Sequence, residues 1–221
     1  MTPDEIQSYF TNKNGAYAFA RWGRPIVPVV FGVEEETLQV VKGAVEAVVA
    51  LAGHKMAETD PELGANLMLF FFRDWDELLG VPNLEKMVPD LEPLVARLKG
   101  AGASQYRAFR FDDQGAIQAC FVFVCMAGEM GQQPAETIAL TQAVQAVILW
   151  GENAFATRSP LAVMPETGQV ILRPEVAGII AASYDPVMPV AQTDASHALR
   201  LYARLQATPA APAAAGDDTR H

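Results

Sequence analysis

Apolar residues follow two periodicities along the chain, and the period of each stretch predicts the element that it forms. Residues 66–72 and 117–126 are apolar on both faces, which is typical of central strands covered on both sides. The apolar run 25–31 contains two prolines that lack N–H donors, so we expect a strand near a sheet edge or a bulge. Residues 106–111 predict a strand that pairs with 117–126 through a turn at 112–115.

Other stretches repeat their apolar residues at helical spacing. The glutamates at 34–36 are expected to start a helix, because negative charge is favourable at a helix N-terminus, and Gly53 is expected to follow its end. Residues 134–150 predict the most apolar helix of the chain, which Gly151 closes and which should be buried on most sides. The other predicted helices are a short one after Thr2, then 91–100, 174–182 and one that begins near Thr193.

Tyr17, Phe19 and Trp22 form a dense aromatic cluster before the first predicted strand. We expect these rings to pack against one edge of the core, and the alternative is a surface for a partner or ligand. Residues 1–206 suffice for one sizeable core, so a single domain is expected there. Residues 207–221 are rich in alanine and proline without apolar periodicity, which predicts a disordered tail.

Composition narrows the class of protein. Apolar residues make up 51% and charged residues 19% of the 221 residues, which excludes disorder for the body of the chain. The formal net charge of −10 repels phosphate, so we expect no nucleic-acid partner. No apolar run reaches the ~20 residues that span a bilayer. The first ten residues are polar and acidic and unlike a secretory leader, so we expect a cytoplasmic chain as it stands, and export only if a leader precedes it.

Motifs for common chemistry are missing from the sequence, which has no phosphate loop, dinucleotide fingerprint, nucleophile elbow or C-x-x-C pair. The histidines are His54, His197 and His221, whereas a catalytic zinc site usually takes three protein ligands, mostly histidine. We expect no shared metal, with His54 capping or packing locally and His197 on the surface of a helix. Cys120 and Cys125 should lie on opposite faces of one strand, roughly 16 Å apart at ~3.3 Å per residue, as two buried thiols.

Several short segments follow one another in a recognisable order. They are RWGRPIVPVVFG at 21–32, Ala52-Gly53-His54, Ala65-Asn66-Leu67 before a strand, the helix at 134–150 and SYDPVMP at 183–189. This order resembles an uncharacterised bacterial family, the domain of unknown function 2927, over about residues 5–205. The order of the motifs carries most of the resemblance.

That family looks like a distant relative of the zincins. The resemblance implies a single α+β domain with a mixed sheet packed on helices and a buried central helix. The zincin active-site helix carries a histidine–glutamate pair, and the matching positions here fall on Thr137 and Ile138. A register that uses Glu136 places Ala135 and Ala139 where histidines belong. Because the metal ligands cannot be carried over, we expect no metal, no cofactor and no catalytic residue.

A retained scaffold without metal ligands predicts a non-catalytic domain that binds a peptide or protein partner. An edge strand of such a sheet can accept an extended peptide by strand addition. The candidate ligand-binding residues are Glu136, Thr137, Gln142, Tyr184 and Asp185. This hypothesis requires a groove that neither Trp150 nor Phe155 fills.

Two alternatives from other classes stay open. One is a peptidase-like hydrolase with an unrecognised site, for which Glu136, Tyr184 and Asp185 would have to converge within hydrogen-bond reach or one water. The other is a structural subunit of an oligomer, with the aromatic cluster at 17–31 as its interface. The sequence predicts neither the oligomeric state nor the identity of a partner.

Overall fold

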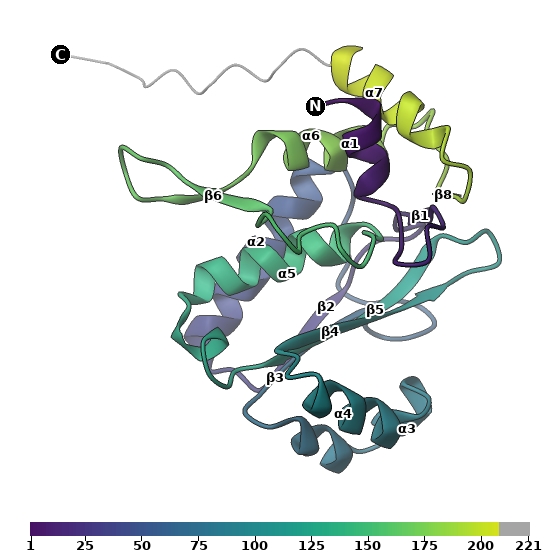
Figure 1. The fold of residues 1–221 in the computed structure, drawn as a ribbon. Coiled ribbons are helices and arrows are strands. Elements are labelled where there is room, and N and C mark those ends of the chain that lie inside the picture. The colour runs from purple at the N-terminus through teal and green to yellow at the C-terminus, as the bar shows by residue number, and fades with distance from the viewer. Residues whose placement is uncertain (208–221) are drawn as a thin grey trace.

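A four-stranded mixed sheet lies between two layers of helices in the computed structural model, which describes residues 1–207 (Figure 1). The strands follow the order β2 (Pro28–Phe31), β3 (Leu67–Phe72), β5 (Ile117–Cys125) and β4 (Gln105–Phe111). The first three run parallel, and β4 pairs antiparallel with β5. The expected α+β class with a mixed sheet packed on helices is confirmed, with β3 and β5 central and β2 at an edge.

Side chains of the two central strands alternate between two apolar cores, one on each face of the sheet. On β3, Leu67 and Leu69 belong to the first core, whereas Phe70 belongs to the second. On β5, Cys120 and Cys125 lie in different cores and are both buried free thiols, as their spacing predicted. Because each face has its own core, neither strand has a polar face in the sequence.

Helices cover both faces of the sheet (Figure 1). One face carries α2 (Glu35–Leu51) and α5 (Ala135–Val147), and the other carries η1 (Trp75–Gly80), α3 (Leu84–Met87) and α4 (Leu91–Gly100). Glutamates occupy the first turn of α2, and Gly53 follows its end with a φ of +63°, a left-handed conformation that suits a helix stop. Both ends of α2 therefore match the prediction.

The remaining elements gather around the first core. They are α1 (Pro3–Ser8), β1 (Phe19–Ala20), η2 (Met130–Gln132), β6 (Leu161–Val163), β7 (Val170–Leu172), α6 (Pro174–Ser183), β8 (Ala191–Gln192) and α7 (His197–Ala207). β1 pairs with β8 and β6 with β7, both antiparallel, and the helices of the two ends, α1 and α7, contact one another. Within residues 1–207, none of the helices combines the length and the apolar character needed to cross a membrane.

The end of the central helix differs from the prediction. α5 stops at Val147 and not at Trp150, because Ile148 is extended and bridges to Arg21. The Leu149 N–H donates to the Ala20 carbonyl at 2.8 Å, so residues 148–150 pair with the N-terminal segment instead of continuing the helix. At the other predicted boundary, Ala207 still belongs to α7, and the rest of the expected disordered tail lies outside the described residues.

The N-terminal aromatic cluster is part of the core. Tyr17, Phe19 and Trp22 are 6%, 2% and 0% exposed, which confirms their packing role, whereas Phe31 of the same segment is 44% exposed. His197, expected on a helix surface, is 1% exposed, and that expectation is wrong. Its ring contacts Phe19, and its Nδ1 lies 2.8 Å from the Tyr17 hydroxyl. The exposed positions of α7 mask this one, because a single buried polar residue does not alter the helical pattern.

The buried His197 makes stability depend on pH. Burial, and secondarily the Arg200 cation, lower the pKa of His197 to about 4. The unfolded chain keeps a pKa of about 6.5, so it binds the extra proton first, and stability present above that value is lost as pH falls toward 4. Denaturant titrations should show that His197→Phe loses about 2 kcal/mol less unfolding free energy between pH 7 and 4.5 than the original chain. Equal losses in both proteins would contradict this assignment.

Candidate functional site

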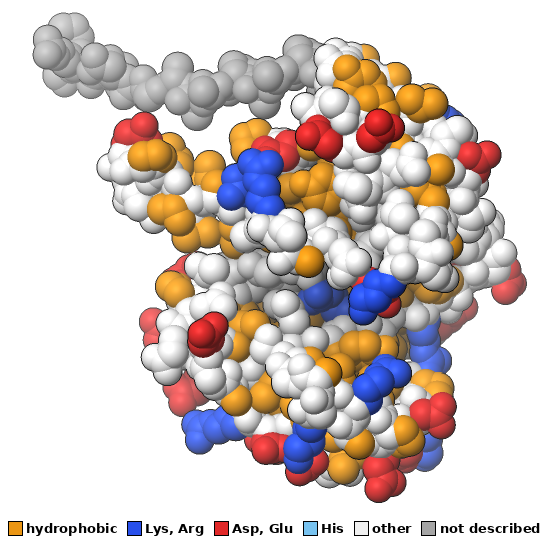
Figure 2. All heavy atoms as spheres, viewed as in Figure 1, with side chains coloured by type: hydrophobic (Ala, Val, Ile, Leu, Met, Phe, Trp, Pro, Cys, Tyr) orange, Lys and Arg blue, Asp and Glu red, His pale blue; other side chains and the backbone are white. Residues whose placement is uncertain are grey.

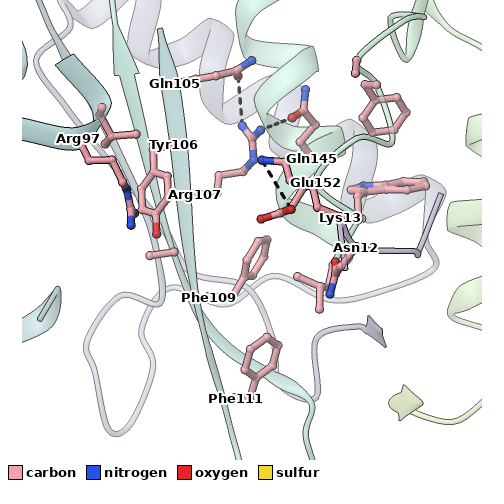
Figure 3. Close-up of a pocket in the computed structure, with 17 residues that line it drawn as sticks. Asn12, Lys13, Arg97, Gln105, Tyr106, Arg107, Phe109, Phe111, Gln145 and Glu152 are labelled. Carbon is pink, nitrogen blue, oxygen red and sulfur yellow. Dashed lines mark hydrogen bonds and ion pairs between the residues drawn. The ribbon is translucent and has the colours of Figure 1, made fainter. Parts of the chain in front are cut away.

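A cavity of about 1040 Å³ runs along the free edge of β4 and continues to the segment after α5. Figure 2 shows the surface hollowed there, between the upper helices and the α4 layer, with basic side chains inside the hollow. The β4 wall includes Gln105, Arg107, Phe109 and Phe111, and the opposite wall includes Gln145, Leu149, Trp150 and Phe155. Tyr106 and Ala108 also line it, so the cavity reaches around the strand edge to both faces of the sheet (Figure 3).

The backbone of β4 is unpaired on its outer side. The Cys125 N–H donates to the Ser104 carbonyl at 2.8 Å, which sets the alternation of hydrogen bonds along the antiparallel pair. Every second residue of β4 therefore bonds to β5, while the N–H and C=O groups of Gln105, Arg107 and Phe109 face away from the sheet. Within residues 1–207 these six groups form no hydrogen bond. They are a template for another extended chain.

Aromatic side chains anchor the C-terminal end of α5, where the opposite wall begins. The last four carbonyls of a helix lack partners within it. Three side chains supply the missing donors. Trp22 Nε1 donates to the Ala146 carbonyl at 2.9 Å, the Tyr184 hydroxyl donates to the Val147 carbonyl at 2.6 Å, and Trp150 Nε1 donates to the Val144 carbonyl at 2.8 Å. Burial raises the pKa of the Tyr184 hydroxyl, which keeps it protonated as a donor.

Trp150 and Phe155 form a wall of the cavity and do not fill it. Trp150 is 9% exposed and stacks on Phe10 at 5.5 Å between ring centroids, with Phe155 against its edge at 4.9 Å. Gly151 fixes this wall on the N-terminal segment, because a Cβ there would lie 2.6 Å from the Thr11 carbonyl oxygen. The cavity along β4 is therefore open at this wall.

Arg107 points from β4 into the cavity, with Gln105 and Gln145 beside it (Figure 3), and three glutamine side chains hold it. Its Nη1 donates to Gln105 at 3.2 Å and to Gln142 at 2.8 Å, and its Nη2 donates to Gln145. All three acceptors are neutral amide oxygens. Burial among them lowers the pKa of the Arg107 guanidinium to about 10, which still leaves it charged at neutral pH. No ion pair within residues 1–207 includes Arg107.

The mouth of the cavity adds further charges. Lys13 and Glu152 face one another at 3.7 Å, both exposed, and Figure 3 shows Lys13 directed into the cavity. Arg97 lies beyond β4, beside Tyr106 (Figure 3). The charged lining is thus Lys13, Arg97 and Arg107 against Glu152 alone, in a chain whose net charge is −10. This cavity is locally positive on an otherwise acidic protein.

None of the five predicted groove residues lines this cavity, and only Gln142 contacts a residue that does. Gln142 is 1% exposed and bonds to Arg107 beneath it, whereas Glu136 and Thr137 lie in the first turn of α5, away from the cavity lining. Asp185 lies outside it, where it bonds to the Val187 N–H and pairs with Arg204. The Tyr184 hydroxyl is bound to the helix end and serves the scaffold.

The three residues that a hydrolase would need do not share a site. Glu136 begins α5 and Tyr184 bonds to Val147 at its other end, which a rise of 1.5 Å per residue separates by roughly 16 Å. His54 bonds through Nε2 to the Arg24 carbonyl at 2.9 Å and packs on Tyr184, the local role expected of it. Across residues 1–207, no three His, Cys, Asp or Glu side chains are grouped as metal ligands would be.

Sequence reasoning missed the β4 side of this site. Gln105, Arg107 and Phe109 lie on one face of β4, and Gln142 and Gln145 are one helical turn apart in α5. The signal in the sequence is therefore one pair of polar residues on a strand face, Gln105 and Arg107, and a second pair in an apolar helix. The glutamines were visible as interruptions of the apolar helix, but nothing local says that they meet an arginine 35 and 38 positions away.

Comparison of the chain with protein-family models, with curated proteins and with solved structures finds no match in any of the three.

Loss of one helix anchor should weaken the fold. Tyr184→Phe removes the donor to the Val147 carbonyl and leaves that group unpaired in a buried residue. We expect a loss of about 2 kcal/mol in the free energy of unfolding, measured by denaturant titration. Tyr202→Phe is the matched control, because the Tyr202 hydroxyl makes no hydrogen bond within the described residues, and its loss should stay below ~0.5 kcal/mol. Equal losses in the two variants would argue against the anchor.

Proposed function

We propose that this chain is a non-catalytic, metal-free, zincin-like domain that binds an extended peptide by strand addition to β4. The observation that carries the proposal is the free outer edge of β4, whose unpaired backbone groups at Gln105, Arg107 and Phe109 open onto the large cavity. A peptide in this position gains main-chain hydrogen bonds from the strand and side-chain contacts from the two cavity walls.

The way the motifs of the sequence meet supports the zincin-like part of the proposal and the resemblance to the domain of unknown function 2927. The segments 21–32 and 183–189 are far apart in sequence, yet the Trp22 N–H donates to the Tyr184 hydroxyl at 3.3 Å and Arg21 lies over the Tyr184 ring at 5.3 Å. His54 packs on the same ring. These segments thus form one cluster behind α5, the central helix that the resemblance predicts to be buried.

The other sheet edge is a poorer template. β2 has only four residues and begins with Pro28, which supplies no N–H donor. No residue of β2 lines the cavity that runs along β4. A seven-residue strand with free backbone groups and two flanking walls favours β4.

The side chains around β4 suit a peptide of mixed character. A strand added in the plane of the sheet would direct alternate side chains to its two faces. Phe109, Leu149 and Trp150 belong to or pack against the core on one face of the sheet, and Tyr106 packs against the core on the other. Apolar contacts of this kind select alternate residues of a peptide, while the backbone ladder holds its direction.

Backbone protection tests the binding mode directly. Random ten-residue peptides displayed on phage are panned against the full chain, and an enriched peptide is synthesised. At ten times its Kd, exchange of the amide protons of Gln105, Arg107 and Phe109 should slow about tenfold. Tyr106 and Ala108 already bond to β5, so their exchange serves as an internal reference. Protection confined to other elements, or no enrichment of any peptide, would refute the proposal.

A pair of phenylalanines offers a matched test of which edge is used. Phe111 lines the cavity at the end of β4 and Phe31 ends β2, and both are 44% exposed. Phe111→Ala should weaken binding of the enriched peptide about tenfold by calorimetry, because an aromatic contact is lost. Phe31→Ala should leave the affinity unchanged. The reverse result would move the site to β2, and mass spectrometry of the incubated peptide, if it showed cleavage, would favour a hydrolase instead.

A further inference from the structure

We propose that Arg107 forms a subsite for one carboxylate group of the bound peptide, carried either by its C-terminus or by an aspartate or glutamate side chain. This inference rests on the proposed function and names the chemistry of its ligand. The carboxylate would enter the cavity on the face of β4 that looks toward α5, where the guanidinium lies (Figure 3).

The positive charge of the Arg107 guanidinium has no counter-charge within residues 1–207. A cation that is partly withdrawn from water is costly unless a counter-charge or hydrogen bonds compensate for the lost hydration. Arg107 donates hydrogen bonds to Gln105, Gln142 and Gln145, but within residues 1–207 it has no carboxylate partner. The three amides position the guanidinium and leave its full positive charge for a ligand to neutralise.

The Arg107 guanidinium has more N–H donors than the three glutamines occupy. A guanidinium carries five N–H groups, and the hydrogen bonds to the three glutamines use three of them. Two N–H groups therefore have no acceptor within the described residues. A carboxylate has two oxygens and accepts two parallel N–H groups from arginine, in a geometry that is both strong and specific. Arg107 lines the open cavity, so a carboxylate of the ligand has access to it there.

The charges around Arg107 favour a ligand group with a single negative charge. Arg97 lies on the other side of β4, beside Tyr106 (Figure 3). On the side toward α5, Glu152 matches the charge of Lys13 at 3.7 Å, so one unmatched positive charge is left there, that of Arg107. A single carboxylate balances it. A phosphate dianion would leave an excess negative charge near Glu152, which favours a carboxylate over a phosphorylated side chain.

Synthetic forms of one peptide test the subsite without changing the protein. The enriched peptide is compared with a form amidated at its C-terminus and with a form in which every aspartate and glutamate is replaced by asparagine or glutamine. One of these two changes should weaken binding about tenfold, and which one does so identifies the source of the carboxylate. Affinities that stay within twofold for both neutral forms would overturn the subsite.

Variants of the protein locate the effect. Arg107→Gln should bind the carboxylate-bearing peptide about tenfold more weakly than the original chain does. The neutral form that weakened binding to the original chain should bind to Arg107→Gln and to the original chain with the same affinity. Arg97→Gln is the matched control, an arginine in the same cavity lining beyond β4, and it should not discriminate between the two forms. A selective loss in Arg97→Gln, or none in Arg107→Gln, would refute the assignment.

The outcomes separate this inference from the proposed function. If the β4 amides are protected by a peptide whose affinity does not depend on a carboxylate, strand addition stands and the subsite fails. If no peptide protects those amides, both fail. Enriched peptides without any carboxylate would likewise count against the subsite.

Discussion

The anchored C-terminal end of α5 is the constraint on which the cavity depends. An indole from the N-terminal segment, a hydroxyl from the loop after α6 and an indole from the segment after α5 all donate to its last carbonyls. Without these donors the carbonyls would be unsatisfied inside the core. The resulting loss of stability exceeds the net stabilisation that the hydrogen bonds themselves provide. With them, the helix stops at Val147 and the next residues leave in an extended direction. Leu149 and Trp150 thereby become the wall opposite β4.

That placement sets the energetics of the cavity floor. Gln142 and Gln145 come from the anchored helix, and Arg107 comes from the edge strand, so the hydrogen bonds between them join the two walls. The acceptors are neutral, so a charge is retained at a place of reduced solvation. A carboxylate at any one of these positions would close an internal ion pair. The actual residues position a cation without neutralising it, a property of binding sites more than of scaffolds.

Scaffold and site share the segment 134–150 but otherwise draw on different parts of the chain. The segments that carry the family resemblance meet behind α5, where Trp22, His54 and Tyr184 contact one another or the helix end. Gln105 and Arg107 lie outside those segments. The side chains that line the cavity therefore supply its chemistry, and other residues give the fold its shape. A locally positive cleft on a chain of net charge −10 also suits an anionic partner, because the local field and not the total charge acts at contact distance.

The sequence alone determined most of the elements and the layering. The strands apolar on both faces, the proline-bearing edge strand, the glutamate-led helix and the opposed cysteines could all be predicted, because periodicity and turn chemistry act within a few residues. Tertiary structure decided the rest: where α5 ends, that His197 is buried, and that Arg107 meets Gln142 and Gln145. Those outcomes depend on hydrogen-bond partners many positions away, and no local pattern encodes which distant donor reaches which acceptor. The free edge of β4 became visible only with the strand order, since a strand's own sequence does not tell whether a neighbour pairs with its second side.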